Sequence, residues 1–459
     1  MRIEKDTLGE VKVPGHVYYG AQTMRAVVNF PISGLRLPRR FIKAQGIVKL
    51  AAARANGSLG LLGRRMCRAI EKAALEVIGG IHDSDFVVDV YQAGAGTSQN
   101  MNANEIIANR AIEVLGGKKG DYRLVNPNDH VNMAQSTNDT IPTSIYLSAH
   151  EAVREDLVPA LMRLKTVLQS KAREFDRIVK AGRTHMQDAV PVRLGQEFSG
   201  YAESVALDLV RIQNAAKSLL ALPIGGNALG TGINAHRRFR ASVIREIGNI
   251  TGIRFRSRKN LFEGIQNIYP VLELSASLRG LAVTLTKIAN DIRLLCSGPR
   301  TGLAEIKLPA VQPGSSIMPG KVNPVMAEML NMVCYQVMGN DTAIAYAIQA
   351  SQLELNVMMP MAAHNLLSSL DILSRGIGAF TDKCTAGIEA DAVRCREYAG
   401  ATLAMATALN PLIGYAAAAE VSKEAYRTGK TVRAVAVEQG ILDEKNAKRA
   451  LDPDKLTRA

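Results

Sequence analysis

The sequence predicts a mainly α-helical protein in which a central bundle of long helices dominates the chain. Five stretches carry apolar residues at intervals of three, four or seven, the spacing that places side chains on one face of a helix. These stretches run over residues 153–175, 194–212, 272–295, 325–338 and 353–373. Long amphipathic helices bury their apolar faces against one another, so a helical bundle is the expected arrangement.

The length of 459 residues is typical of about three domains. A mixed, mostly helical N-terminal domain is predicted over residues 1–140, the long-helix bundle over 141–395, and a small helical C-terminal domain over 396–459. The last domain is predicted from shorter helical patterns broken at Gly429 and Gly440. With 47% hydrophobic and 21% charged residues, the composition is that of a globular protein rather than a disordered chain.

Within the N-terminal domain the chain is expected to begin with a short hairpin. Arg2 to Val13 alternates and has a turn signal around Gly9-Glu10, and helical patterns follow from about residue 38 to 79. Stretches rich in Gly and Asn interrupt the helices at 93–104 and 126–138. Because binding groups often lie on loops held by a rigid scaffold, these interruptions are candidate functional loops.

Several protein classes are disfavoured by composition. No apolar run approaches the roughly 18 to 20 residues of a membrane span, and the N-terminal MRIEKDTLGEVKVPG has charges where a signal peptide needs an apolar core, so we expect a cytoplasmic protein. The 5 cysteines include no CxxC pair, and the 7 histidines have no metal-ligand spacing. We therefore expect neither a disulfide framework nor a metal site.

The net charge of +14 is densest over residues 237–259, where Phe239 and Phe255 lie among arginines. Nucleic-acid binding is disfavoured, since no binding motif accompanies the patch and aromatic residues are only 5% with no Trp. We expect a solvated basic surface, which could also steer small dianions toward a site.

Three familiar sequence motifs are incomplete or absent. The segment 314–321 resembles a phosphate-binding P-loop, but its glycine spacing is one residue too long and Val322 stands where Ser or Thr must meet magnesium. Residues 230–235 fit GxGxxA, yet no apolar strand precedes them and no βαβ pattern surrounds them. A GxSxG nucleophile motif is absent from the sequence.

Four segments concentrate hydroxyl and amide side chains. They are GAGTSQNMNANE (94–105), NPNDHVNMAQSTND (126–139), GRTHMQDAVP (182–191) and GSSIMPGKVNP (314–324). Many neutral donors together with Lys321 and His185 suit the binding of carboxylates with one group left for proton transfer. Each segment alone also fits an ordinary role, because Ser and Asn are frequent in turns and helix caps and a lone histidine such as His185 is often structural.

These four segments together resemble the aspartase/fumarase superfamily, whose signature loop reads GSSxMPxKxNP, and the resemblance covers nearly the whole chain. Its nearer branches are the aspartate ammonia-lyases and, next, the class II fumarases. The resemblance implies that superfamily's three-domain helical fold. It further implies an elimination that produces fumarate without a cofactor.

The resemblance also implies a role for each site residue. Ser315 would be the base that removes a proton next to the substrate's β-carboxylate, with its loop closing to exclude water. The groups that hold the resulting charged carboxylate would be Thr97, Ser136, Thr137 and the backbone of Ser316. The groups that hold the other carboxylate would be Lys321, Asn323 and Thr184. Asn138 and His185 would face the leaving group, and Glu328 would partner the histidine.

Details of the motifs favour ammonia over water as the leaving group. Thr97-Ser98, Ser136-Thr137-Asn138 and Asn126 resemble aspartases, whereas His185 and His364-Asn365 resemble fumarases. A non-catalytic relative with the same fold is the third alternative, and the intact Ser315 set argues against it. The resemblance implies a homotetramer with composite active sites and a small dicarboxylate substrate, and neither a nucleic acid nor a membrane is expected as a partner.

Overall fold

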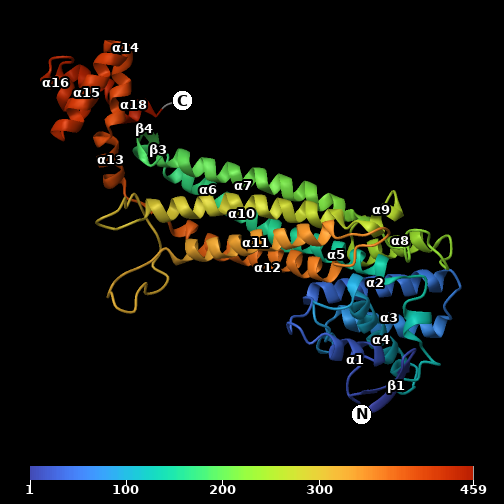
Figure 1. The fold of residues 1–459 in the computed structure, drawn as a ribbon. Helices are drawn as coiled ribbons and strands as arrows, with labels where there is room; N and C mark the ends of the chain where they lie inside the picture. The colour runs from blue at the N-terminus through green and yellow to red at the C-terminus, as the bar shows by residue number, and fades with distance from the viewer. Residues whose placement is uncertain (458–459) are drawn as a thin grey trace. The chain divides into compact units, whose positions relative to one another are not determined.

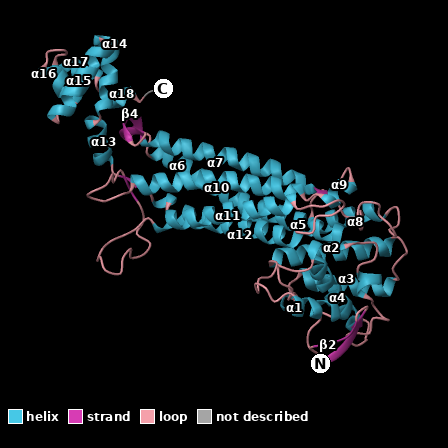
Figure 2. Ribbon diagram, in the orientation of Figure 1, coloured by secondary structure: helices cyan, strands magenta, loops and turns pink. Residues whose placement is uncertain are grey.

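The computed structural model describes residues 1–457 and is mainly helical, as predicted (Figure 2). The chain forms two compact units. The first unit comprises Met1–Pro159, Val210–Ala282 and Tyr335–Ser374, and the second comprises Ala160–Leu209, Val283–Cys334 and the residues from Arg375 onward. The boundaries fall inside long helices, so α7, α10, α11 and α12 each contribute one end to each unit.

The first unit begins with the expected hairpin. Strands β1 (Arg2–Asp6) and β2 (Gly9–Val13) pair in antiparallel register. The helices that follow are α1 (Ala21–Asn29), α2 (Arg39–Ser58), α3 (Arg64–Ile78), α4 (Thr97–Val114), α5 (Thr137–Ala152), α8 (Phe239–Thr251) and α9 (Leu261–Gln266). Helix α2 packs against α3, α5 and α8, and it is buried on most of its surface (Figure 1). It is therefore the central helix of this unit.

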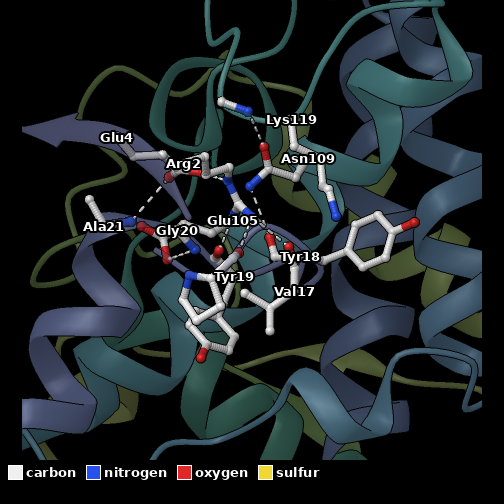
Figure 3. A network of polar contacts seen from close by, with 12 residues as sticks. Arg2, Glu4, Val17, Tyr18, Tyr19, Gly20, Ala21, Glu105, Asn109 and Lys119 are labelled. Atoms are coloured by element: carbon white, nitrogen blue, oxygen red, sulfur yellow. Dashed lines mark hydrogen bonds and ion pairs between the residues drawn. The ribbon is translucent and has the colours of Figure 1, made fainter. Parts of the chain in front are cut away.

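A buried polar network attaches the N-terminal segment to α4 (Figure 3). The Glu105 carboxylate accepts the backbone N–H groups of Gly20, Gln22 and Thr23 at 2.8, 2.8 and 3.1 Å. Glu4 accepts the backbone N–H of Ala21. Burial raises the pKa of Glu105 to about 7, because the low-dielectric interior disfavours the charged carboxylate. The network fixes the chain around residue 20 on the helix that begins at Thr97.

The segment 94–105 is not a loop, contrary to expectation, because most of it is the first half of α4. Its asparagines have low helix propensity, but they and Gln99 are buried and hydrogen-bonded. These contacts with other helices override the local preference. The polar residues singled out by the sequence therefore lie on a rigid element.

The long helices of the predicted bundle are present. They are α6 (Val158–Glu174), α7 (Leu194–Ala216), α10 (Tyr269–Leu295), α11 (Val325–Gln349) and α12 (Met359–Lys383). A five-residue π-helical stretch, Val153–Leu157, joins α5 to α6. In the second unit, Tyr201 on α7 donates to Asp291 on α10, and Asn331 on α11 donates to Asn290 on α10.

The predicted helix limits differ most from those observed in α11 and α12. Helix α11 continues past 338 to Gln349. The stretch predicted to start at Leu353 becomes helical only at Met359, with Pro360 in the first turn, a position that proline favours. The preceding loop is held by the buried Asn356, whose Nδ2 donates to the carbonyl oxygen of Ala347 at 2.9 Å.

The segment 182–191 is a hairpin rather than a loop. Strands β3 (Val179–Thr184) and β4 (Gln187–Arg193) pair antiparallel, and His185 and Met186 form the turn between them. Both turn residues have positive φ, 56° and 62°. Two-residue hairpin turns with positive φ usually contain Gly or Asn. This turn contains neither, so the sequence carried no signal for the hairpin. The other strands are two-residue pairs, β5 (Ala221–Leu222) with β6 (Arg256–Ser257) and β7 (Ile306–Lys307) with β8 (Glu389–Ala390).

The C-terminal region consists of short helices. They are α13 (Ala392–Ala401), α14 (Asn410–Ile413), α15 (Tyr415–Thr428), α16 (Val432–Glu438), α17 (Glu444–Ala450) and α18 (Pro453–Leu456). Gly429 follows α15 with φ 70°, a left-handed conformation that glycine adopts easily. Val421, Val435 and Leu451 belong to a hydrophobic core of this region's own. No helix within residues 1–457 is long and apolar enough to cross a membrane.

Candidate active site

The residues singled out by the sequence fall into one group in each unit. In the first unit are Thr97, Ser136, Thr137 and Asn138. In the second unit are Thr184, His185, Ser315, Ser316, Lys321, Asn323 and Glu328. Each group is described within its own unit.

Thr97 is the first residue of α4 and is exposed. The turn before it has Ala95 and Gly96 at positive φ, 59° and 88°. A side chain at Gly96 would also meet Ile141 of α5 at 3.2 Å, so the close approach of the two elements favours glycine. The N–H of Ala95 donates to the carbonyl oxygen of Val357 at 2.8 Å. The start of α4 is thus fixed in place.

Ser136 caps the N-terminus of α5. Its Oγ accepts the N–H of Asn138 at 3.2 Å, and the Asp139 carboxylate accepts the N–H of Ser136 at 3.0 Å, which forms a capping box. Thr137 is the first helical residue. A helix N-terminus carries partial positive charge, so hydroxyls here stand where an anion is favoured.

Asp139 is a residue that the functional reading of the sequence missed. It is fully buried, and besides the Ser136 N–H it accepts those of Gly225 and Asn227 at 3.0 and 2.8 Å. Burial raises its pKa to about 7. The carboxylate therefore fixes the turn at 225–228 against the start of α5. The S-x-x-D spacing from Ser136 is a capping-box signal that could have identified it.

Lys49 on α2 is the second residue missed, and only 1% of its surface is exposed. Its ammonium donates to three side-chain amide oxygens, those of Asn100, Asn132 and Gln135, at 2.9, 3.0 and 3.0 Å. Burial lowers its pKa to about 7, and Asp139 opposes that shift. Its only sequence signal is a charge within the apolar run IVKLAAA.

The hairpin of the second unit holds Thr184 and His185 at its exposed end. The base of the hairpin is anchored by the fully buried Glu305, which pairs with Arg183 at 2.9 Å and Lys180 at 3.3 Å. Glu328 lies in the first turn of α11, and no hydrogen bond or ion pair within residues 1–457 joins it to His185. The predicted partnership of His185 with Glu328 stays a prediction.

The loop 314–324 is exposed but has a defined local fold. Ser315 Oγ accepts the backbone N–H groups of Ile317 and Met318 at 3.2 and 3.0 Å. The N–H of Gly314 donates to the carbonyl oxygen of Lys321 at 2.7 Å. Two N–H donors on one hydroxyl oxygen would stabilise negative charge there, which a serine base requires.

The same loop lines an open pocket of about 570 Å³. Ser315 and Lys321 are among the lining residues. Gly314 is needed for this fold, since a side chain there would meet the carbonyl oxygen of Lys321 at 2.7 Å and the N–H of Asn323 at 2.8 Å. The Asn323 Nδ2 donates to the carbonyl oxygen of Gly314 at 2.7 Å. This bond uses one of the two hydrogens of the amide nitrogen, so the other can still be donated to a ligand.

The remaining sequence features have ordinary structural roles. Asn126 caps the π-helical segment Pro127–Val131 by accepting the N–H groups of Asn128 and Asp129. Phe239 and Phe255 in the basic patch are buried, so neither is available to stack on a nucleic-acid base. Within residues 1–457 no group of three or more His, Cys, Asp or Glu side chains is placed to hold a metal ion.

Comparison with known proteins identifies the family. A family model described as Lyase matches residues 9–339, and one described as Fumarase C C-terminus matches residues 405–458. The chain is 47% identical to an aspartate ammonia-lyase of Bacillus subtilis, with all of this chain and 96% of that protein covered. It is 51% identical to a class II fumarate hydratase of Halobacterium salinarum, with 99% and 97% covered.

A solved structure agrees with this assignment. The class II fumarase of Schistosoma mansoni matches with a TM-score of 0.96 at 36% identity, over 99% of this chain and 98% of that one. The matches extend over the whole length and include both units. The chain belongs to the aspartase/fumarase superfamily of lyases.

Proposed function

We propose that this chain is an aspartate ammonia-lyase, which converts L-aspartate reversibly into fumarate and ammonia. Membership in the superfamily supports lyase chemistry, and the B. subtilis relative is named for this reaction. The single observation that carries the choice of ammonia is the orientation of the Asn138 side chain.

Asn138 Nδ2 donates to the carbonyl oxygen of Ala228 at 2.7 Å. Its Oδ1 is therefore left as an acceptor, and no donor within residues 1–457 bonds to it. An ammonium group has only hydrogens to offer, so a neutral acceptor complements it, whereas a leaving hydroxide needs an acid. This orientation supports an amine as the leaving group.

In the proposed mechanism Ser315 removes the proton from the carbon next to the β-carboxylate, which leaves an enediolate. The N–H groups of Ile317 and Met318 would stabilise the alkoxide form of Ser315. The groups that would hold the enediolate are Thr97, Ser136, Thr137 and the Ser316 N–H. Those that would hold the other carboxylate are Thr184, Lys321 and Asn323. Asn138 and His185 face the leaving group, and Glu328 orients the histidine once the site closes. No cofactor is required.

Class II fumarate hydratase is the second candidate. His185, exposed at the end of a rigid hairpin, could donate the proton that a leaving hydroxide needs. The H. salinarum relative, at 51% identity, is named for this reaction. The two candidates share the base and the carboxylate groups and differ only at the leaving group.

We also propose that the protein is a homotetramer whose sites combine residues of different subunits. An uncharged stripe on α11 supports association: Tyr335 and Tyr346 are 55% and 65% exposed, and Gly339 and Thr342 between them are exposed too. Exposed tyrosines on one helix face are typical of protein interfaces.

The test is fumarate absorbance with L-aspartate and, separately, with L-malate. We expect turnover of L-aspartate, with fumarate and ammonium formed in equal amounts. Turnover of L-malate but not L-aspartate would instead assign the chain to the fumarate hydratases. Turnover of neither would reject both.

A further inference from the structure

The buried Lys49 is not used by any step of the proposed reaction, yet it lies at the centre of a network that reaches Thr137. Two elements surround its ammonium: α4 supplies Asn100, and the segment before α5 supplies Asn132 and Gln135. All three partners are neutral amides, and the charged group that faces Lys49 is Asp139. Burying a lysine among neutral acceptors is costly, which calls for a reason.

The chemistry of the donors fixes the direction of the hydrogen bonds. An ammonium can only donate, so the oxygen of Asn100 faces Lys49 and its nitrogen faces the other way. That nitrogen donates to Thr137 Oγ1 at 3.2 Å. The Thr137 hydroxyl is thus an acceptor on its inner side. Its single hydrogen has no acceptor within residues 1–457 and can be donated to a ligand.

We propose that Lys49 is a positioning residue for the dicarboxylate site, acting through Asn100 to hold the Thr137 hydroxyl as a donor toward the substrate carboxylate. The inference deepens the proposed function and rests on it. A chain of hydrogen bonds that starts from a cation polarises each member, so Thr137 becomes a stronger donor than an isolated hydroxyl. The positive charge of Lys49 also lies on the inner side of Thr137, whose hydroxyl must bind an anionic carboxylate.

The same ammonium orients the segment that leads into α5. The oxygen of Asn132 faces Lys49 and also accepts from Asn100 and Asn104, while its nitrogen donates to the carbonyl oxygen of Gln135. A purely structural role for Lys49 is therefore the competing explanation. A double-mutant cycle separates the two, because only a residue that acts through Thr137 loses its effect when Thr137 is changed.

The first experiment compares the parent, Lys49→Met, Thr137→Val and the double variant. Values of kcat/KM are measured for whichever of L-aspartate and L-malate the parent uses. We expect Lys49→Met to lower kcat/KM by about 10²-fold, the usual effect of losing one preorganised donor. The double variant should lie within about threefold of Thr137→Val alone. Full activity in Lys49→Met, or losses that multiply, would overturn the proposal.

A second variant covers the case in which Lys49→Met does not fold. Asn100→Asp keeps the shape of the side chain and gives Lys49 a carboxylate partner, so the fold is retained. It replaces the nitrogen that donates to Thr137 by an acceptor, which captures the Thr137 hydrogen. We expect at least about a tenfold loss of kcat/KM with an unchanged or higher Tm, and little further loss in the Thr137→Val background. Parental activity would reject the inference.

Lys43→Met is the matched control, since Lys43 lies on the same helix and forms a surface pair with Glu151 at 2.5 Å. It should retain parental activity. Whether the proposed function is correct is tested separately, by measuring the activity of the unmodified parent. If the parent binds fumarate but turns over neither substrate, the same cycle read as fumarate dissociation constants decides the role of Lys49. A parent that binds no fumarate would overturn both proposals.

Discussion

The two groups of candidate site residues differ sharply in how the protein holds them. Thr137 at the start of α5 is 9% exposed and connected through Asn100 to the buried Lys49. In the loop 314–324, Ile317 is 83% exposed, and within residues 1–457 the Ser315 hydroxyl is bonded only to backbone N–H groups of the loop itself. Thr137 is thus built into the core of its unit, whereas Ser315 lies on a self-contained loop at the surface.

This difference suggests a division of labour. Donors that stabilise developing charge are most effective when they are already oriented, because no reorganisation is needed during the reaction. A base that must exclude water is better carried by a loop that can close, and such loops come from weakly held parts of a protein. The predictions below follow from this contrast, from the largest effect on activity to the smallest.

Ser315→Ala should lower kcat/KM by about 10²- to 10⁴-fold, the range for loss of a general base. Stability should change by less than about 0.5 kcal/mol, because the loop is exposed. Steady-state kinetics and urea unfolding of the same preparation measure both. Fumarate formation within a few fold of the parent would show that another group is the base.

Asp139→Ala, unlike Ser315→Ala, should lower the stability of the protein strongly as well as its activity. Loss of the carboxylate leaves the N–H groups of Ser136, Gly225 and Asn227 without an acceptor. We expect a loss of about 2 to 4 kcal/mol in the free energy of unfolding and about 10²-fold in kcat/KM, as Asn138 shifts with its turn. Urea unfolding is the measurement. The exposed Asp129→Ala is the control, and an equal effect of the two changes would contradict the contrast.

Gly314→Ala should disturb the loop alone. The added methyl group would meet the carbonyl oxygen of Lys321, so the turn that carries Ser315 must shift. We expect kcat/KM to fall about tenfold, or about 1.4 kcal/mol, with Tm nearly unchanged. Gly400→Ala, where a methyl group meets nothing within 4 Å, is the matched control. A drop in Tm as large as that of Asp139→Ala would mean that the loop is part of the core.

Glu105→Gln should change the pH dependence of stability without changing activity. The pKa of Glu105 is raised from 4.5 to about 7 in the folded protein, so between these values the folded state holds the proton more tightly than the unfolded state. The free energy of unfolding of the parent should therefore fall as pH rises through this window, by at most about 1.4 kcal/mol per pH unit. Urea midpoints across the window should show a flatter profile for the variant. Identical profiles for the parent and the variant would show that a group other than Glu105 causes the pH dependence.

The long helices and the signature loop could be predicted because each depends on local pattern. Apolar spacing identified the bundle, and the Ser, Lys and Asn of the loop 314–324 stood out by type. Helix α4 could not be predicted, since its asparagines are stabilised by partners distant in sequence, such as Lys49 on α2 and the carbonyl oxygen of Asp85. The turn at His185-Met186 likewise lacks the glycine that marks such turns.

Lys49 and Asp139 show a different limit. Their importance arises from burial and from partners distant in sequence, such as Gln135 and Asn227. A lysine in an apolar run and an aspartate in a capping box are common, and neither pattern states which groups the side chain will orient. Only the assembled helices reveal that both residues support the start of α5.

The central claim is that the buried group and the loop group of one active site come from different subunits. The most direct measurement mixes two inactive variants, Ser315→Ala and the double variant Ser136→Ala/Thr137→Val, by unfolding and refolding them together. The mixture should regain activity with L-aspartate, because some sites then receive an intact group from each variant. A mixture no more active than the sum of its two components, refolded separately, would contradict the claim.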